Sequence, residues 1–167
     1  MSSTEHKAEG PARVRVFVLT VSDTRTTETD ASGTAIVDML TAAGHHVAAR
    51  AIEKDDPARV AELVRQHAAI ADVDVIITTG GTGLTSRDST FEAIDALLNK
   101  KLPGFGELFR MLSYHELGPA AMMSRACAGT IGKVVVLSLP GAEGAVRLAM
   151  TKLVLPELGH LVQQTRK

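Results

Sequence analysis

The stretch Val73-Asp-Val-Ile-Ile-Thr-Thr-Gly-Gly-Thr-Gly83 decides the expected fold. Its first part, Val73–Thr78, is short and rich in β-branched residues, which predicts a buried strand rather than a helix. Its second part contains three glycines, and glycine lets a backbone turn tightly and approach a ligand closely. The stretch therefore predicts a strand that runs directly into a ligand-binding turn.

Strand and helix patterns alternate on both sides of this stretch. Val14–Val21 is nearly continuously apolar, as expected for a strand buried on both faces of a parallel sheet. Further strands are predicted at His46–Ile52 and Val134–Leu139, and helices at Ser32–Ala43, from Asp56-Pro57 onward, at Ser89–Leu98, at Gly106–Leu117 and at Gly144–Val162 with an interruption at Pro156. This alternation predicts an α/β sandwich with a mostly parallel sheet and right-handed crossovers.

The composition argues against several classes of protein. Aromatic residues make up only 3% of the 167 residues, too few for the stacking platforms of single-stranded nucleic acid binders. The net charge of −1 provides no basic field for nucleic acid or anionic lipid, and Val14–Val21 is far too short to span a membrane. We expect a cytoplasmic protein without nucleic-acid or membrane partners, in which residues 1–12 form a flexible tail and residues 13–167 a single domain. The single cysteine, Cys127, is expected to be a small buried side chain rather than a nucleophile.

Three loops are expected to converge on one site. In α/β folds, ligands bind where the carboxyl ends of the strands open into a crevice. The segments after Val21, Thr78 and Leu139 all follow such ends. The loop after Thr78 offers backbone N–H groups as an anion cradle, although it lacks the Lys-Ser/Thr of a P-loop and the spacing of the dinucleotide fingerprint.

Acidic residues lie close to this loop in the sequence. Asp88 either caps the helix predicted at Ser89–Leu98 or holds a Mg²⁺ ion beside a bound phosphate. Asp55 and Asp56 either cap the helix that follows them or share that cation with Asp88. Each acid thus has a structural and a functional interpretation.

Other polar residues allow two interpretations as well. Ser22 and Asp23 form either a polar turn or a set of ligand contacts. Ser124-Arg125 either holds a phosphate through the guanidinium or forms a surface salt bridge. Glu107 suits the first turn of a helix on electrostatic grounds alone, and Pro140-Gly141 reads as an ordinary turn after a strand.

Taken together, these motifs resemble the MoaB/MogA family of molybdenum cofactor biosynthesis proteins. The resemblance rests on Thr79-Gly-Gly-Thr-Gly83 with Arg87-Asp-Ser-Thr90, on Pro103-Gly-Phe-Gly-Glu107, on Ser124-Arg-Ala126 and on Leu139-Pro-Gly141. It extends from about Val14 to Val162, and Phe105–Tyr114 is closer to the MoaB branch than to the MogA branch.

This resemblance implies a three-layer α/β/α sandwich, a homotrimer or homohexamer, and contacts with other molybdenum cofactor biosynthesis proteins. It also implies that molybdopterin is a substrate, adenylylated with Mg²⁺ and ATP to release pyrophosphate. By the same resemblance, phosphate would be cradled by Thr79, Gly80, Gly81, Thr82 and Gly83, and the nucleotide pocket would be lined by Glu107, Pro140 and Gly141. The pterin would be faced by Ser22, Asp23, Ser124 and Arg125. The catalytic, metal-holding acids would be Asp55 and Asp88.

The sequence departs from the family at one point. Glu53-Lys54 stands where the family usually has an apolar residue and proline, so either Asp55 or Asp56 is the counterpart of the second acid. A protein of the MoaB type that binds molybdopterin or a nucleotide without turnover, as a carrier, is therefore the alternative to an adenylyltransferase. The homologous domain of a molybdate-inserting protein is a third alternative.

Overall fold

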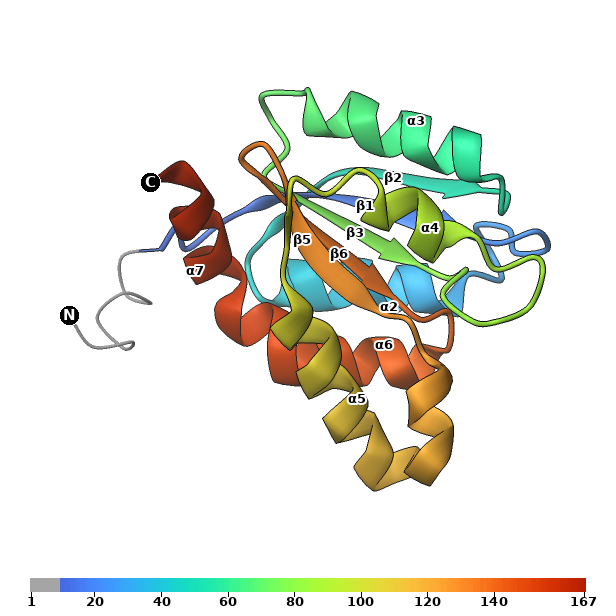
Figure 1. Cartoon of the computed structure of the whole chain (residues 1–167). Helices are drawn as coiled ribbons and strands as arrows, with labels where there is room; N and C mark the ends of the chain where they lie inside the picture. Colours follow the sequence, from blue (N-terminus) through green and yellow to red (C-terminus); the bar gives the residue numbers. More distant parts are fainter. Residues whose placement is uncertain (1–9) are drawn as a thin grey trace.

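The computed structural model describes residues 10–167 as one six-stranded sheet flanked by helices (Figure 1). The strands are β1 (Arg15–Val21), β2 (His46–Glu53), β3 (Val75–Thr79), β4 (Lys100–Lys101), β5 (Cys127–Ile131) and β6 (Val134–Leu139), in the spatial order β2-β1-β3-β6-β5-β4. The pairs among β2, β1, β3 and β6 are parallel, while β5 runs antiparallel to both β6 and β4. The predicted mostly parallel α/β sheet is confirmed.

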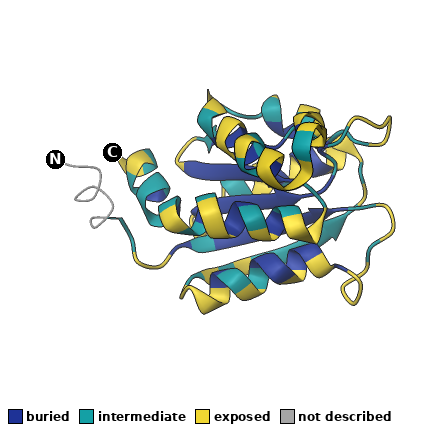
Figure 2. Ribbon diagram, turned by 90° about the horizontal axis from the view of Figure 1, so that it is seen from below, coloured by how far each residue is buried: buried dark blue, intermediate teal, exposed yellow. Residues whose placement is uncertain are grey.

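Helices cover both faces of the sheet. The helical elements are α2 (Ala31–Ala42), α3 (Pro57–Ala68), α4 (Thr90–Asp95), α5 (Pro103–Leu117), the 3₁₀ segment η1 (Gly118–Met123), α6 (Glu143–Ala149), the π-helical segment η2 (Met150–Val154) and α7 (Leu155–Arg166). One apolar core lies between the sheet and α2, α5, α6 and α7, and a second lies between the sheet and α3 and α4. Figure 2 shows the buried strands between helices whose outer faces are exposed. The three-layer α/β/α sandwich is confirmed.

The central strands have the burial that their sequences predict. β3 and β6 are buried at every position, which fits their continuous runs of Val, Ile and Leu because both faces of a central parallel strand meet helices. The cap expected at the start of α3 is also present: Asp56 accepts hydrogen bonds from the backbone of Ala58 and Arg59, with Pro57 in the first turn. Gly44, with a φ of 85°, follows the end of α2 as expected.

Some elements differ from expectation. β4 and β5 were not predicted, and α4 ends at Asp95 rather than Leu98. α5 begins at Pro103 rather than Gly106 because proline is well tolerated in the first turn of a helix. The interruption expected at Pro156 takes the form of the π-helical segment η2 just before it, which accommodates a proline that cannot donate to the preceding turn.

The first nine residues of the expected tail lie outside the described residues. Within the described part, Gly10 lies against α7: a Cβ on Gly10 would be 2.7 Å from the carbonyl carbon of Gly159. None of the helices in residues 10–167 is both long and apolar enough to cross a membrane.

Candidate functional site

The loops after β1, β3 and β6 meet around Gly80. The Gly80 N–H donates to the Leu139 carbonyl at 3.0 Å, and Gly80 has a φ of 101°. A Cβ on Gly80 would lie 2.2 Å from the Val21 carbonyl oxygen, so a larger residue does not fit without a backbone shift. The predicted convergence of the three loops is confirmed.

A small cavity of about 190 Å³ opens where these loops meet. It is lined by Thr20, Val21, Ser22, Arg25, Thr79, Gly80, Gly81 and Gly141. Its walls are fixed by hydrogen bonds between loops: the Thr79 hydroxyl donates to the Pro140 carbonyl at 2.8 Å, and the Ser32 hydroxyl donates to the Gly141 carbonyl at 2.6 Å. We call this cavity the Gly80 cavity, after the glycine around which the three loops meet.

Asp55, and not Asp56, faces the glycine-rich loop. The Asp55 Oδ1 atom accepts hydrogen bonds from the Ser89 backbone at 3.3 Å and from its hydroxyl at 2.5 Å. The Asp55 Oδ2 atom lies 2.9 Å from the position that a Cβ on Gly81 would occupy. Asp56 instead caps α3. The structure thus separates the two adjacent acids that the sequence left as alternatives.

Asp88 lies at the other end of the loop. Its Oδ2 atom accepts hydrogen bonds from the Thr85 backbone at 3.0 Å and from the Thr85 hydroxyl at 2.6 Å. The same oxygen lies 2.8 Å from the position of a Cβ on Gly83. Asp88 does not cap α4, since Ser89 occupies the N-cap position and no side-chain cap is formed there.

Asp55 and Asp88 offer the donor chemistry of a Mg²⁺ site. Within residues 10–167, no hydrogen bond reaches the Asp55 Oδ2 or the Asp88 Oδ1 atom, so each carboxylate keeps one oxygen for a cation. No group of three or more His, Cys, Asp or Glu side chains in the same range forms a protein-only metal site. Mg²⁺ usually binds one or two carboxylates together with phosphate oxygens, and the donor set therefore fits.

Ser22 and Asp23 form part of the loop framework. The Ser22 hydroxyl accepts hydrogen bonds from the backbone of Thr24 and Arg25. Asp23 binds the Arg87 guanidinium with two hydrogen bonds of 3.0 and 2.7 Å and accepts the Asp55 N–H at 3.1 Å. The hydrogen bonds from Arg87 and then from the Asp55 backbone lower the pKa of Asp23. Ser22 thus forms a polar turn, as one of its two interpretations has it, and it also lines the Gly80 cavity.

Arg125 holds the glycine-rich loop from the opposite side. Its guanidinium donates to the Gly83 carbonyl at 2.6 and 3.1 Å, and to the Asp88 carbonyl at 3.3 Å. It also pairs with Glu92 and lies over the Phe91 ring, 5.0 Å from the ring centroid. The salt-bridge interpretation of Arg125 is therefore present in the structure, together with a set of loop contacts that the sequence did not indicate.

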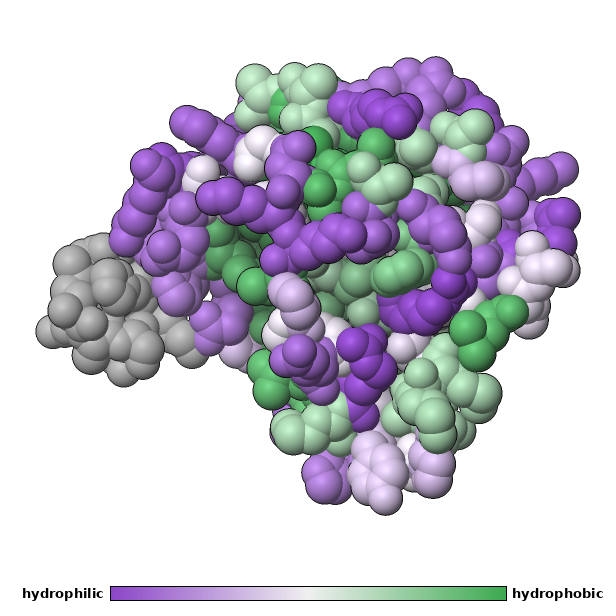
Figure 3. Space-filling view, in the orientation of Figure 1, coloured by the Kyte–Doolittle hydropathy of each residue, from purple (hydrophilic) through white to green (hydrophobic). Residues whose placement is uncertain are grey.

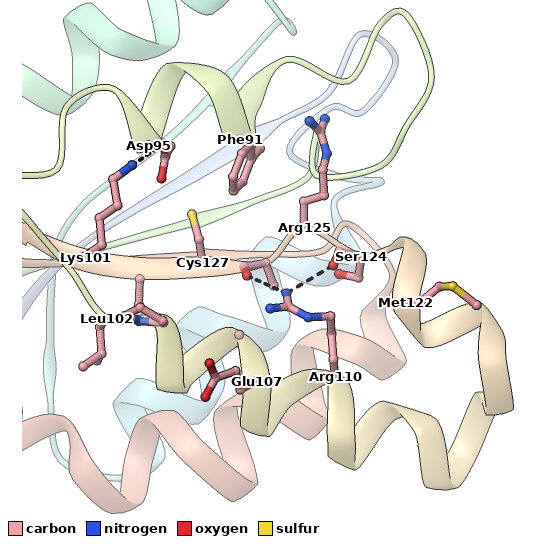
Figure 4. Close-up of a pocket in the computed structure, with 14 residues that line it drawn as sticks. Phe91, Asp95, Lys101, Leu102, Glu107, Arg110, Met122, Ser124, Arg125 and Cys127 are labelled. Atoms are coloured by element: carbon pink, nitrogen blue, oxygen red, sulfur yellow. Dashed lines mark hydrogen bonds and ion pairs between the residues drawn. The ribbon is translucent and has the colours of Figure 1, made fainter.

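A second cavity, of about 390 Å³, lies between α4, α5 and the start of β5 (Figure 4). Its lining residues include Glu107, Arg110, Ser124, Arg125 and Cys127, whereas Gly141 lines the Gly80 cavity. The structure thus places Glu107 apart from Gly141, with which it was expected to line one pocket. The Ser124 hydroxyl is buried and has no hydrogen-bond partner among the described residues.

The thiol of Cys127 is not suited to nucleophilic attack. Cys127 is half-buried, packed against the core beneath α3 and α4. Burial, and then the nearby Asp95 carboxylate, raises the pKa of Cys127 to about 11. Because a thiol with this pKa stays protonated at neutral pH, it does not provide a thiolate.

Sequence reasoning missed several residues of the site. Arg25 lines the Gly80 cavity, and Asp30, whose side chain is fully buried, accepts a hydrogen bond from Thr20 of its lining. Burial would raise the pKa of Asp30, but hydrogen bonds from Thr20, the Gly33 N–H and Arg50 lower it overall. The available signal was position: Arg25 stands in the first loop, a few residues after Val21. Thr90, whose buried hydroxyl lacks a partner in the described chain, gave no such signal.

Comparison with known proteins agrees with this site. A family profile described as a probable molybdopterin binding domain matches residues 17–160. The chain belongs to this family. A curated relative, molybdenum cofactor biosynthesis protein B of Bacillus cereus, is 56% identical over 162 residues, covering 96% of each chain.

Solved structures place the chain in the MoaB branch of the molybdopterin-binding family. A crystal structure of molybdenum cofactor biosynthesis protein B has a TM-score of 0.91 at 53% identity, covering 95% of this chain and 99% of that chain. The tungsten cofactor synthesizing protein MoaB from Pyrococcus furiosus has a TM-score of 0.83 at 38% identity, with coverage of 94% and 99%. The chain is therefore one of the molybdenum cofactor biosynthesis proteins.

Proposed function

We propose that this protein adenylylates molybdopterin with Mg²⁺ and ATP and releases pyrophosphate. The observation that carries the proposal is the position of Asp55 and Asp88, whose carboxylates abut Gly81 and Gly83 from two sides of one loop. A carboxylate beside a phosphate cradle would repel the ligand unless a cation lay between them. Two such carboxylates support a site for a metal-bound polyphosphate.

The reaction needs no nucleophilic side chain. An oxygen of the terminal phosphate of molybdopterin attacks the α-phosphorus of ATP, the bond from that phosphorus to the bridging oxygen breaks, and pyrophosphate leaves. Mg²⁺, when bound, neutralises charge on the reacting phosphates. The protein's part is to orient the two substrates in line and to exclude competing arrangements.

The residues have distinct proposed roles. The backbone of the glycine-rich loop, residues 79–83, binds phosphate, together with Pro140 and Gly141 beside it. Asp55 and Asp88 hold the cation. Ser22, Asp23, Ser124 and Arg125 remain proposed pterin contacts and Glu107 a proposed nucleotide contact; the second cavity, with its unpartnered Ser124 hydroxyl, has room for part of a substrate.

A carrier without turnover is the second candidate. Its support is the pair Glu53-Lys54 just before Asp55, which departs from the family pattern. Against it, Asp55 contacts Ser89 and lies at Gly81 despite this departure. The geometry of the acid thus favours the enzyme.

We also propose that the protein works as a homotrimer or homohexamer and contacts other proteins of the pathway. Large apolar side chains are exposed along α5 and η1, on the projection at the bottom of Figure 3. They are Leu108, Met111, Tyr114, Leu117, Met122 and Met123. An apolar surface of this kind is typical of a protein–protein interface, and the elution volume and mass from light scattering test it.

Pyrophosphate release tests the proposed activity. Purified protein mixed with molybdopterin, ATP and Mg²⁺ is expected to release pyrophosphate, and Asp88→Asn is expected to abolish release while ATP still binds. The substitution keeps the shape of the side chain and its contacts with Thr85 but removes the charge. Release at the level of a protein-free control, across a range of Mg²⁺ concentrations, would refute the enzyme assignment and leave the carrier.

A further inference from the structure

We propose that Arg25 is the cationic side chain that binds a phosphate group in the Gly80 cavity. Among the described residues that line this cavity, Arg25 alone carries a charge; the others are glycines, hydroxyl residues and a valine. The inference rests on the proposed function only in taking the ligand to be a phosphate compound. Its source is either the polyphosphate of ATP or the terminal phosphate of molybdopterin.

The Arg25 side chain is held by one hydrogen bond, which leaves most of its N–H donors available for a ligand. Its Nη1 atom donates to the Ser32 hydroxyl at 3.0 Å, and Ser32 in turn donates to the Gly141 carbonyl at 2.6 Å. This is the single side-chain hydrogen bond of Arg25 within residues 10–167. Because a guanidinium carries five N–H donors, most of them are left for a ligand.

The buried Asp30 is shared by two arginines and pairs more closely with Arg50 than with Arg25. Arg50 forms the close pair with the Asp30 Oδ2 atom, at 3.0 Å, whereas Arg25 lies 3.7 Å from the Oδ1 atom. Thr20 and the Gly33 N–H supply the other hydrogen bonds to this carboxylate. Two arginines therefore face one carboxylate, which leaves one net positive charge in this group, and Arg25 is the arginine that lines the cavity.

The size of the cavity restricts what enters it. Small-molecule sites usually measure about 300 Å³ or more, so a cavity of about 190 Å³ accommodates part of a ligand rather than a whole nucleotide. Backbone of Gly80 and Gly81 forms one wall, and Arg25 stands on the side of the first loop. Because the Gly80 N–H already donates to the Leu139 carbonyl, a phosphate group held between the Gly81 backbone and the Arg25 guanidinium matches this arrangement.

Arg50 provides a matched control. Both arginines contact Asp30, but Arg50 comes from β2 and does not line the cavity. Arg25→Gln and Arg50→Gln each remove one cation from Asp30, while only Arg25→Gln removes the cation from the cavity. Melting temperatures of both variants are measured first, so that binding is compared between folded proteins.

Calorimetric titrations test the proposal with ATP, molybdopterin and adenosine added separately, so that no turnover is required. We expect Arg25→Gln to raise the dissociation constant of ATP or of molybdopterin by about tenfold or more, with adenosine binding unchanged and Arg50→Gln like the wild type. The ligand that weakens identifies the source of the phosphate. Unchanged binding of both ligands to Arg25→Gln, or equal weakening in Arg50→Gln, would overturn the assignment.

Arg25→Lys keeps the test decisive if Arg25→Gln does not fold. Lysine preserves the charge but lacks the planar fork of donors, so the dissociation constant of the same ligand should rise by a smaller factor, about threefold. Wild-type affinity in Arg25→Lys for both phosphate ligands would then count against a guanidinium contact. Because these titrations do not depend on pyrophosphate release, failure of the proposed activity and failure of this assignment give different results.

Discussion

Two adjacent carboxylates, Asp55 and Asp56, have different tasks in this protein. Asp56 satisfies backbone N–H groups at the start of α3, whereas Asp55 accepts hydrogen bonds from Ser89 and lies against Gly81. One residue along the chain thus separates a capping group from a group of the site. Both acids follow closely after β2, which ends at Glu53.

Substitution of the two acids should separate stability from activity. Asp56→Ala is expected to lower stability by about 1 kcal/mol through loss of the cap, or roughly 2–4 °C in melting temperature, with activity retained. Asp55→Asn keeps an acceptor for Ser89 but loses the charge, so pyrophosphate release should disappear with little change in melting. Calorimetric melting and the release assay are compared for both. If Asp56→Ala, still folded, were the inactive one, the assignment of Asp55 would be wrong.

Sequence indicated the glycines of the loop and the two acids, because backbone freedom and carboxylates leave a recognisable pattern beside a strand end. It could not indicate Arg25 or the loop contacts of Arg125. Those roles depend on which distant segments meet: Arg125 contacts Gly83 across the fold, and Arg25 reaches Gly141 through Ser32. Because arginine is common on protein surfaces, the residue type alone does not predict a role in a site.

At the scale of elements, Arg125 joins the start of β5 to the glycine-rich loop and to α4. Its guanidinium binds the carbonyl of Gly83 and that of Asp88, and its backbone N–H donates to the Thr82 carbonyl. Hydrogen bonds that involve a charged partner contribute about 1.5–3 kcal/mol each when they are sheltered from water. Arg125 therefore fixes the position of the loop, whether or not it also contacts substrate.

Loss of this link should loosen the loop. Arg125→Ala is expected to lower stability by ~2 kcal/mol and to speed amide hydrogen exchange in residues 82–89 more than in β3. Glu92→Gln is the control, because it weakens only the exposed partner of Arg125 and should cost no more than about 0.5 kcal/mol. Exchange in the loop that stays at the wild-type rate in Arg125→Ala would contradict the proposed role.

The elements that sequence missed have a common physical reason. β5 contains small residues and Gly129, where a Cβ would lie 2.2 Å from the Lys100 carbonyl oxygen. A strand without a β-branched run gives little signal, and close backbone approach, not side-chain packing, explains its composition. β4 has two residues, both lysine, and charge on a short edge strand is a usual way to discourage further pairing. The central strands were predictable because burial on both faces demands a continuous apolar run.

At the scale of the whole molecule, Asp74 ties the sheet to the last helix. Its carboxylate, 7% exposed, binds Arg15 of β1 at 2.8 Å and Arg166 of α7 at 2.8 Å. Burial would raise the pKa of Asp74, but the hydrogen bonds from the Arg15 side chain and backbone and from Arg166 lower it to about 2. These contacts lie at the amino-terminal ends of β1 and β3, and the glycine-rich loop follows the opposite end of β3.

Stability should therefore fall in acid through Asp74. Because the folded pKa lies below the unfolded value of about 3.9, the contribution is present above about pH 4 and is lost as pH falls toward 2. Asp74→Asn is expected to reduce stability at pH 7 by about 1–2 kcal/mol, allowing for screening at the half-exposed arginines. Urea unfolding at pH 7, 4 and 2 measures the free energy of unfolding of the variant and of the wild type. The difference between these two free energies should narrow as the pH falls, and a constant difference would refute the role of ionisation.

The identity of the product tests the central claim most directly. Wild-type protein is incubated with molybdopterin, ATP and Mg²⁺. The small molecules are then separated, and their masses are determined by mass spectrometry. The proposed function predicts molybdopterin that has gained an adenylyl group, in amounts matching the pyrophosphate released, and none with Asp88→Asn. Recovery of only unmodified molybdopterin and ATP from a protein that binds both would contradict it and identify a carrier.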